Sequence, residues 1–203
     1  MKTHFLDYFS KVSTIAKSID VKILEDIING LVCLRNSGGR LFMIGVGGSA
    51  ANCSHAVNDF RKIADIETYS PCDNVSELTA RTNDEGWDTI FAAWLKTSKL
   101  NDRDAVMVLS VGGGDSKKNV SPNIVKALDF AKSTNTKIFG IVGRDGGYTK
   151  RVGDAVIVIP TADEKLITPL SESFQSVVLH GIVCHPEIAK ISSKWETVDK
   201  YIS

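Results

Sequence analysis

Four ionisable side chains, in two segments far apart in the sequence, have the types and spacing that acid–base or metal chemistry requires. His55 and Asp59 are four positions apart, and Glu172 and His180 are eight apart. Residues four apart on a helix share one face, so His55 and Asp59 can meet a single ligand. A carboxylate and an imidazole with tuned pKa values can move a proton between neighbouring carbons, and the same residue types bind Zn²⁺. The pattern indicates an acid–base pair or a metal centre.

Each histidine also has an ordinary interpretation. His55 taken alone is typical of a solvated helix histidine. His180 lies within the apolar run 177–183, where we expect it to be desolvated and therefore to need a partner. Taken alone, His180 would be a satisfied core histidine. Because both histidines accompany two carboxylates and two glycine-rich loops, we favour the functional interpretation.

Two glycine-rich segments follow apolar runs and precede helical ones. The first is Gly45-Val46-Gly47-Gly48-Ser49, and the second is Ser110-Val111-Gly112-Gly113-Gly114, with Ser121-Pro122-Asn123 after a polar insert. The free N–H groups at a helix start and the helix dipole attract phosphate, and two such loops at the carboxyl ends of strands define a crevice. The predicted phosphate-binding residues are Gly47, Gly48, Ser49, Ser110, Gly112, Gly113 and Ser121.

Other interpretations of these loops stay open. Gly45, Gly47 and Ala50 fit the dinucleotide pattern G-x-G-x-x-G/A, and Glu67 lies about twenty residues later, where a ribose-binding acid would belong. A tight strand-to-helix turn without a ligand is another alternative. The serines also suit helix capping, above all Ser121 ahead of its proline.

The elements that must position these residues follow from periodicity. Apolar residues at three- and four-residue steps predict helices at about 5–16 and 21–35 and one long helix from near Thr168 and Pro169 to near His185 and Pro186. Short apolar runs bounded by glycine or proline predict strands at 41–46, 105–111, 137–142 and 155–160. Buried strands alternating with helices predict an α/β fold, in which helices cover both faces of a parallel sheet. With no repeat or linker, we expect a single domain over 1–203.

Composition narrows the class of protein. The 24 basic residues balance the 24 acidic ones, so no net field favours nucleic acid or an anionic membrane. The four cysteines form no CxxC pair, which indicates reduced thiols in a cytoplasm. The charged N-terminal segment lacks the continuous apolar stretch of a signal peptide or membrane span. We therefore expect a cytoplasmic protein that binds its anionic ligand locally, with no nucleic-acid or membrane partner.

The order and spacing of the motifs resemble the sugar isomerase (SIS) domain family, and within it the phosphoheptose isomerases. The resemblance runs over nearly the whole chain. It rests on the two leading helices, G-V-G-G-S with His55 behind it, Thr82-Asn83-Asp84 ahead of Trp87, S-V-G-G-G, Ser121-Pro122-Asn123, G-R-D-G-G at 143–147 and I-T-P-L-S-E-S-F-Q-S-V-V-L-H at 167–180.

This resemblance implies a flavodoxin-like three-layer sandwich. It also implies an isomerase that converts sedoheptulose 7-phosphate to D-glycero-D-manno-heptose 7-phosphate through an enediolate, for the heptose of lipopolysaccharide or capsule. It implies a homotetramer with sites between subunits, in which the helices of residues 1–38 pack, and often a zinc cofactor. By position, the implied site residues are His55, Asp59, Glu172 and His180 as metal ligands, the last three also catalytic, with Ser49, Ser110 and Ser121 on the phosphate and Asp84 on the sugar.

The chain departs from the family pattern at this site. The family has asparagine where Val46 stands, glutamate where Asp59 stands and glutamine where Glu172 stands. The second carboxylate is therefore interpreted as restoring what the shorter Asp59 lacks in reach. The serine–threonine–serine phosphate loop is reduced to Ser110-Val111-Gly112, with an insertion at 115–119, so glycine N–H groups replace hydroxyls. These changes indicate a divergent branch.

One hypothesis from another class remains beside the isomerase. SIS domains also serve as non-catalytic sugar-phosphate sensors and as partners of the replication initiator. A regulator would not need two histidines and two carboxylates around one crevice, so we favour the enzyme. Which carboxylate is the base stays open, because the two can titrate as a coupled pair.

Overall fold

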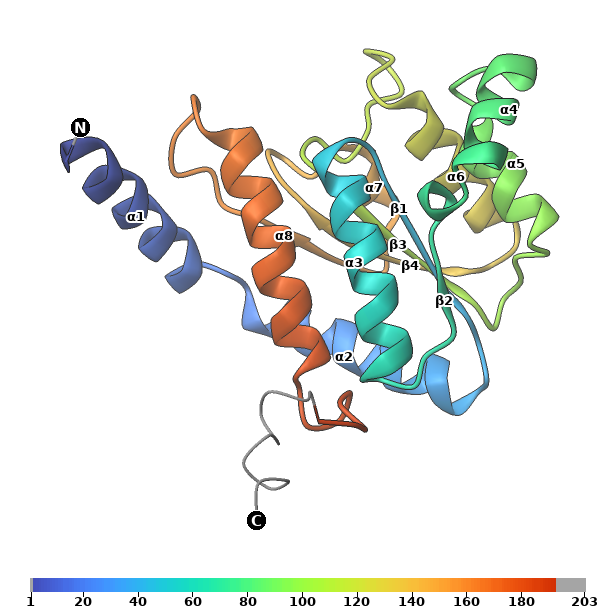
Figure 1. Cartoon of the computed structure of the whole chain (residues 1–203), viewed down its shortest axis with the longest axis horizontal. Helices are drawn as coiled ribbons and strands as arrows, with labels where there is room; N and C mark the ends of the chain where they lie inside the picture. The colour runs from blue at the N-terminus through green and yellow to red at the C-terminus, as the bar shows by residue number, and fades with distance from the viewer. Residues whose placement is uncertain (1, 193–203) are drawn as a thin grey trace.

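The structure, a computed structural model, describes residues 2–192 and contains one parallel sheet (Figure 1). The strand order is β2-β1-β3-β4-β5, and each pair of neighbouring strands is parallel. This is the doubly wound order typical of flavodoxin-like sheets. The strands are β1 (Leu41–Gly45), β2 (Thr68–Tyr69), β3 (Ala105–Ser110), β4 (Lys137–Val142) and β5 (Ala155–Val158).

Helices cover both faces of the sheet. Leu41 and Met43 face a core shared with α2, α3 and α8, whereas Phe42 and Ile44 of the same strand face a core shared with α5 and α6. This alternation follows from the period of two in a strand. The helices are α1 (Lys2–Lys17), α2 (Val21–Asn36), α3 (Gly48–Lys62), α4 (Val75–Glu85), α5 (Ile90–Thr97), α6 (Pro122–Ser133), α7 (Gly147–Val152), α8 (Ile167–Val183) and the short 3-10 helix η1 (Pro71–Asp73).

The predicted α/β fold is confirmed, including the two leading helices and the long helix near the C-terminus. The strand predicted at 137–142 is found with those bounds, and the other three end one or two residues earlier than predicted because the last residues already belong to the loops. Sequence analysis missed β2, which is only two residues long and has no apolar run. It nevertheless pairs with β1 through Leu41 and Thr68.

The glycine-rich loops lie at the carboxyl end of the sheet, as expected. Gly47 adopts φ 64°, a left-handed conformation that strains other residues, and it directly precedes α3. Gly113 has φ 69°, and a Cβ there would lie 2.0 Å from the carbonyl oxygen of Gly146. Glycine therefore allows the first loop to turn sharply into α3 and the second loop to approach the backbone of Gly146.

No helix within residues 2–192 is long and apolar enough to cross a lipid bilayer.

Candidate functional site

The candidate site is built on α3 and α8, which lie side by side over one face of the sheet (Figure 1). α3 begins directly after the first glycine-rich loop, and α8 begins near the same edge of the sheet. The two helices run in the same direction, so residues at similar distances from the two helix N-termini contact each other.

His55, Asp59 and His180 come together where the two helices meet. The Nε2 atoms of the histidines are 3.0 Å apart, and Asp59 Oδ2 lies 3.1 Å from His55 Nε2 and 3.5 Å from His180 Nε2. One ligand atom from each residue lies within 4.8 Å of the others. Two imidazoles and one carboxylate match the donors that zinc prefers, and three protein ligands leave a coordination position open for substrate. The group is able to hold a divalent metal.

The neighbouring amide orients the Asp59 carboxylate. Asn58 Nδ2 donates to Asp59 Oδ1 at 3.0 Å, which leaves Oδ2 to face the two histidines. Asp59 is also nearly buried, whereas both histidine rings are more than half exposed. The carboxylate is thus the fixed member of the group.

The expectation that His180 is desolvated is wrong for the single chain, since its side chain is 55% exposed. Leu179 and Ile182 face the core, but His180 points to the other side of α8, where Val177 is also exposed. A run of apolar residues in a helix does not bury every side chain in it, because consecutive side chains point about 100° apart around the helix axis. His180 does have partners, namely His55 and Asp59.

Glu172 is on α8 and lies outside this three-residue group. Its carboxylate lies beside Gly48, the first residue of α3. A Cβ on Gly48 would lie 2.5 Å from the Glu172 Oε2 atom, so the carboxylate rests directly on the backbone of Gly48. A negative charge is favourable at a helix N-terminus. The structure therefore places the two predicted carboxylates at different depths of the α3–α8 pair, Glu172 beside the glycine-rich loop and Asp59 beside the histidines.

The predicted phosphate serines occupy different environments. Ser49 is buried in the first turn of α3, and its Oγ has no hydrogen-bond partner among the described residues. The Oγ of Ser110 accepts from the N–H of Gly113 at 3.0 Å and so braces the second loop. Ser121 adopts φ 48°, and its side chain makes no capping bond to α6. The capping interpretation of Ser121 therefore finds no support in this structure.

The second glycine-rich loop is held by α7. The N–H of Tyr148 donates to the carbonyl of Gly114 at 2.7 Å, and the N–H and hydroxyl of Thr149 donate to the carbonyl of Gly113. These bonds turn two loop carbonyls toward α7.

Asp84 is not part of the group in the single chain. It lies exposed near the end of α4, where its carboxylate accepts from Asn83 Nδ2 at 2.7 Å. The insertion after the second loop forms a tight turn closed by an antiparallel bridge between Asp115 and Val120. No described contact connects either segment to the histidines.

The dinucleotide interpretation of the first loop does not fit the topology. Glu67 directly precedes Thr68, which pairs with Leu41 at the start of β1. It therefore lies at the amino edge of the sheet, whereas the loop follows the carboxyl end of β1. An acid at that edge cannot reach the ribose of a nucleotide bound at the loop.

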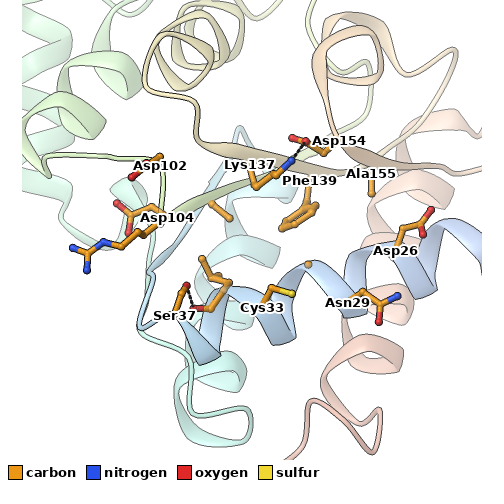
Figure 2. A pocket seen from close by; sticks show the side chains of 14 residues that line it. Asp26, Asn29, Cys33, Ser37, Asp102, Asp104, Lys137, Phe139, Asp154 and Ala155 are labelled. Atoms are coloured by element: carbon orange, nitrogen blue, oxygen red, sulfur yellow. Dashed lines mark hydrogen bonds and ion pairs between the residues drawn. The ribbon is translucent and has the colours of Figure 1, made fainter.

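Two cavities of similar volume lie against the α/β core among the described residues. One of about 520 Å³ adjoins the site, with Asp59 and His180 in its wall. The other, of about 510 Å³, lies between α2 and the amino ends of β3, β4 and β5, with Cys33 and Phe139 in its wall (Figure 2). The first cavity is the functional candidate because it adjoins the His–Asp–His group. It lies between the C-terminal parts of α3 and α8, with Ile63 and Cys184 also in its wall.

Sequence analysis missed three amide residues of the site, Asn52, Asn58 and Gln175. Asn52 lies three positions after Ser49 and three before His55, so the helical spacing was a signal for it. Gln175 lies three and four positions before Val178 and Leu179, on the apolar face of the predicted helix, where a polar residue needs a partner. The partnership of Asn52 with Gln175 became known only when the two helices were placed together, whereas Asn58 bonds its sequence neighbour Asp59.

Comparison with known proteins agrees with this architecture. No model of a protein family matches the chain. A phosphoheptose isomerase from Trichlorobacter lovleyi is 32% identical over 72% of this chain and 71% of its own length. A protein of Thermoplasma volcanium named "Probable phosphoheptose isomerase" is 31% identical over 79% of this chain and 81% of its own length. The chain belongs to the phosphoheptose isomerase family.

A solved structure shares the fold of this family member. The phosphoheptose isomerase from Neisseria gonorrhoeae superposes with a TM-score of 0.76 at 20% identity, covering 90% of this chain and 94% of the other. The expected resemblance of fold is thereby confirmed, and the α3–α8 pair belongs to a phosphoheptose isomerase scaffold.

Proposed function

We propose that the protein interconverts sedoheptulose 7-phosphate and D-glycero-D-manno-heptose 7-phosphate, supplying heptose for a surface polysaccharide. The observation that carries the proposal is the meeting of His55, Asp59 and His180 on two helices that start beside a glycine-rich loop. A phosphate at the loop and a reacting carbonyl near the histidines would use both ends of the same helix pair. Family membership supports the reaction class.

The proposed chemistry is a proton transfer between C1 and C2. A carboxylate, Asp59 or Glu172, takes a proton from C1 of the ketose, and the electron pair forms the C1–C2 double bond of the enediol. His180 as general acid protonates the oxygen on C2. His180 then accepts the proton of the hydroxyl on C1, the carboxylate returns its proton to C2, and the aldose carbonyl forms at C1.

We further propose that His55, Asp59 and His180 hold Zn²⁺. When bound, the metal would stabilise negative charge on the substrate oxygens as a Lewis acid, in place of proton donation by His180, because the Nε2 of His180 would then be a metal ligand. Glu172 is the better candidate for the base in that case, because its carboxylate lies outside the three-residue group and keeps its proton-accepting lone pairs.

The proposal includes a homotetramer in the cytoplasm, with residues 1–38 in the subunit contacts. Both histidine rings are more than half exposed in the single chain. Asp84 is exposed and lies apart from the group. A site completed by a neighbouring subunit would account for both observations.

The test is formation of aldose from sedoheptulose 7-phosphate by the purified protein, with and without a chelator and added Zn²⁺. We expect turnover that the chelator removes and Zn²⁺ restores. The double variant Asp59→Ala, Glu172→Ala should bind phosphate and lose turnover. Normal turnover in this variant would contradict the proposed roles, and sugar-phosphate binding without turnover in the natural protein would favour a sensor.

A further inference from the structure

Polar contacts join α3 and α8 at three levels along the helices. The contact of Glu172 with Gly48 is the first, a hydrogen bond between Asn52 and Gln175 is the second, and the histidine pair is the third. The partners at the second and third levels are 123 and 125 positions apart in the sequence. The two helices thus keep one register over the length of the site.

Asn52 is bonded to α8 twice. Its Nδ2 donates to the backbone carbonyl of Glu172 at 2.9 Å and to Gln175 Oε1 at 3.0 Å. Gln175 is completely buried, and the residues around it on α8, Phe174, Val178 and Leu179, belong to the apolar core. This amide pair is therefore a polar contact packed against the apolar core.

A contribution to the stability of the folded protein does not explain why an amide pair stands at this position. Gln175 Nε2 has no hydrogen-bond partner among the described residues, and burying an unpaired donor is unfavourable. An apolar side chain of similar size would fill the same space without that cost. A buried polar contact of this kind specifies one arrangement of two helices, since other registers would leave further polar atoms unpaired.

The His–Asp–His group needs this arrangement. Sliding or rotating α8 by one residue would move His180 by about 1.5 Å along the axis and about 100° around it. The two Nε2 atoms are only 3.0 Å apart in the observed register. Metal coordination tolerates errors of about 0.2 Å in ligand distance, so the group can form in one register only.

We propose that Asn52 and Gln175 are positioning residues, which fix the register of α3 against α8 and thereby hold His180 opposite His55 and Asp59. Neither amide touches the reacting atoms. The proposal rests on the proposed function insofar as the group acts on metal or substrate, but the register itself can be measured without either.

The first measurement is Zn²⁺ affinity, by competition with a chelating dye. In Asn52→Leu and in Gln175→Leu we expect affinity to fall about 10- to 100-fold, as for other groups that orient metal ligands. Asn52→Asp should lose less affinity than Asn52→Leu, because Gln175 can turn its free Nε2 toward the new carboxylate in a charge-assisted bond, although the bond to the carbonyl of Glu172 is lost. Phe174→Leu is the matched control, which loosens the packing of α8 and leaves the amides intact; it should unfold earlier and keep its Zn²⁺ affinity.

The second measurement is made without metal, from the ring ¹⁵N signals of His55 and His180 by NMR. Asn52→Leu should shift or broaden both signals, and Asn52→Asp should change the His180 signal less than Asn52→Leu does. Unchanged Zn²⁺ affinity and unchanged histidine signals in Asn52→Leu would overturn the proposal, as would an equal loss in Phe174→Leu. If the natural protein binds no Zn²⁺, the histidine signals of the metal-free protein test the register proposal by themselves. If it shows no turnover but these contrasts appear, the proposed function fails and the register proposal stands.

Discussion

At the scale of single residues, hydrogen bonding separates serines that look alike in the sequence. Ser49 and Ser110 each stand in a glycine-rich loop region, but only Ser110 has a partner among the described residues, the N–H of Gly113. Ser49 carries a buried hydroxyl without a partner. Such an atom is unfavourable for stability unless a ligand uses it, which is consistent with the proposed phosphate role.

Alanine substitutions distinguish the two serines. Ser110→Ala should lower the free energy of unfolding by about 1–3 kcal/mol, because the buried N–H of Gly113 loses its acceptor. Ser49→Ala should change it by less than about 0.5 kcal/mol and raise KM for the sugar phosphate about tenfold, the equivalent of about 1.4 kcal/mol of binding. Thermal unfolding and steady-state kinetics measure both. An unaltered KM in Ser49→Ala would remove that hydroxyl from the phosphate site.

The four cysteines, all free thiols, differ in the reactivity expected of them. Burial raises the pKa of the Cys53 thiol well above its usual value, and the nearby Cys72 and Asp73 add to the effect. Burial also raises the pKa of Cys72. The thiolate is the nucleophile, so iodoacetamide should modify the exposed Cys33 and Cys184 first and Cys53 only on unfolding. Peptide mapping after timed alkylation gives the order, and early modification of Cys53 would contradict its burial.

The same thiol predicts a pH dependence of stability. Because its pKa is raised in the folded protein, Cys53 contributes fully to stability below the ordinary thiol pKa of about 8.5. As pH rises above that value the unfolded chain ionises first, and stability falls until the folded pKa is passed. A denaturant midpoint that decreases between about pH 8 and 10 in the natural protein, and less in Cys53→Ala, is the expected result.

At the scale of elements, glycines set how closely helices and loops approach each other. Gly48 lies against the flexible end of Glu172, whereas Gly147 lies against the backbone of the second loop, with its ideal Cβ position 2.2 Å from the carbonyl oxygen of Gly112. A side chain can move aside at the first position, but the backbone cannot at the second. Gly147 also has φ 53°, which favours glycine.

Alanine should therefore affect mainly turnover at Gly48 and mainly stability at Gly147. Gly48→Ala should cost less than about 1 kcal/mol of stability but displace the Glu172 carboxylate, so that kcat falls if Glu172 is the base. Gly147→Ala should destabilise by about 1–3 kcal/mol through strain at the loop–α7 junction. Chemical denaturation and turnover measured side by side give the comparison. A strong loss of stability in Gly48→Ala would show that the Glu172 carboxylate is held rigidly.

At the scale of the whole molecule, α1 extends away from the sheet and its helices (Figure 1). Ile15 near its C-terminal end is fully buried, but Phe5, Leu6 and Phe9 are each more than 60% exposed. Exposed apolar clusters of this kind mark interaction surfaces. Together with the exposed histidine rings, this face supports the proposed contact between subunits.

Charge introduced on α1 should disrupt assembly. The triple variant Phe5→Glu, Leu6→Glu, Phe9→Glu is expected to lower the molecular mass in solution from that of a tetramer, measured by light scattering after size exclusion. Because the three side chains are exposed, its circular dichroism spectrum should match the natural protein. A natural protein that is monomeric, or a variant with unchanged mass, would place the subunit contact elsewhere.

The sequence by itself determined the alternation of strands and helices, the glycine-rich loops and the chemically capable residues, because these depend on periodicity and residue type over short distances. Its predictions failed where burial depends on the direction in which a side chain points, as at His180, and where a two-residue strand forms only beside a neighbour, as in β2. The tertiary structure alone decided that His180 meets His55 and Asp59, that Glu172 lies at Gly48, and that Asn52 finds Gln175. The physical reason is that these contacts join residues more than 100 positions apart, whose distances are set by the packing of α8 against α3.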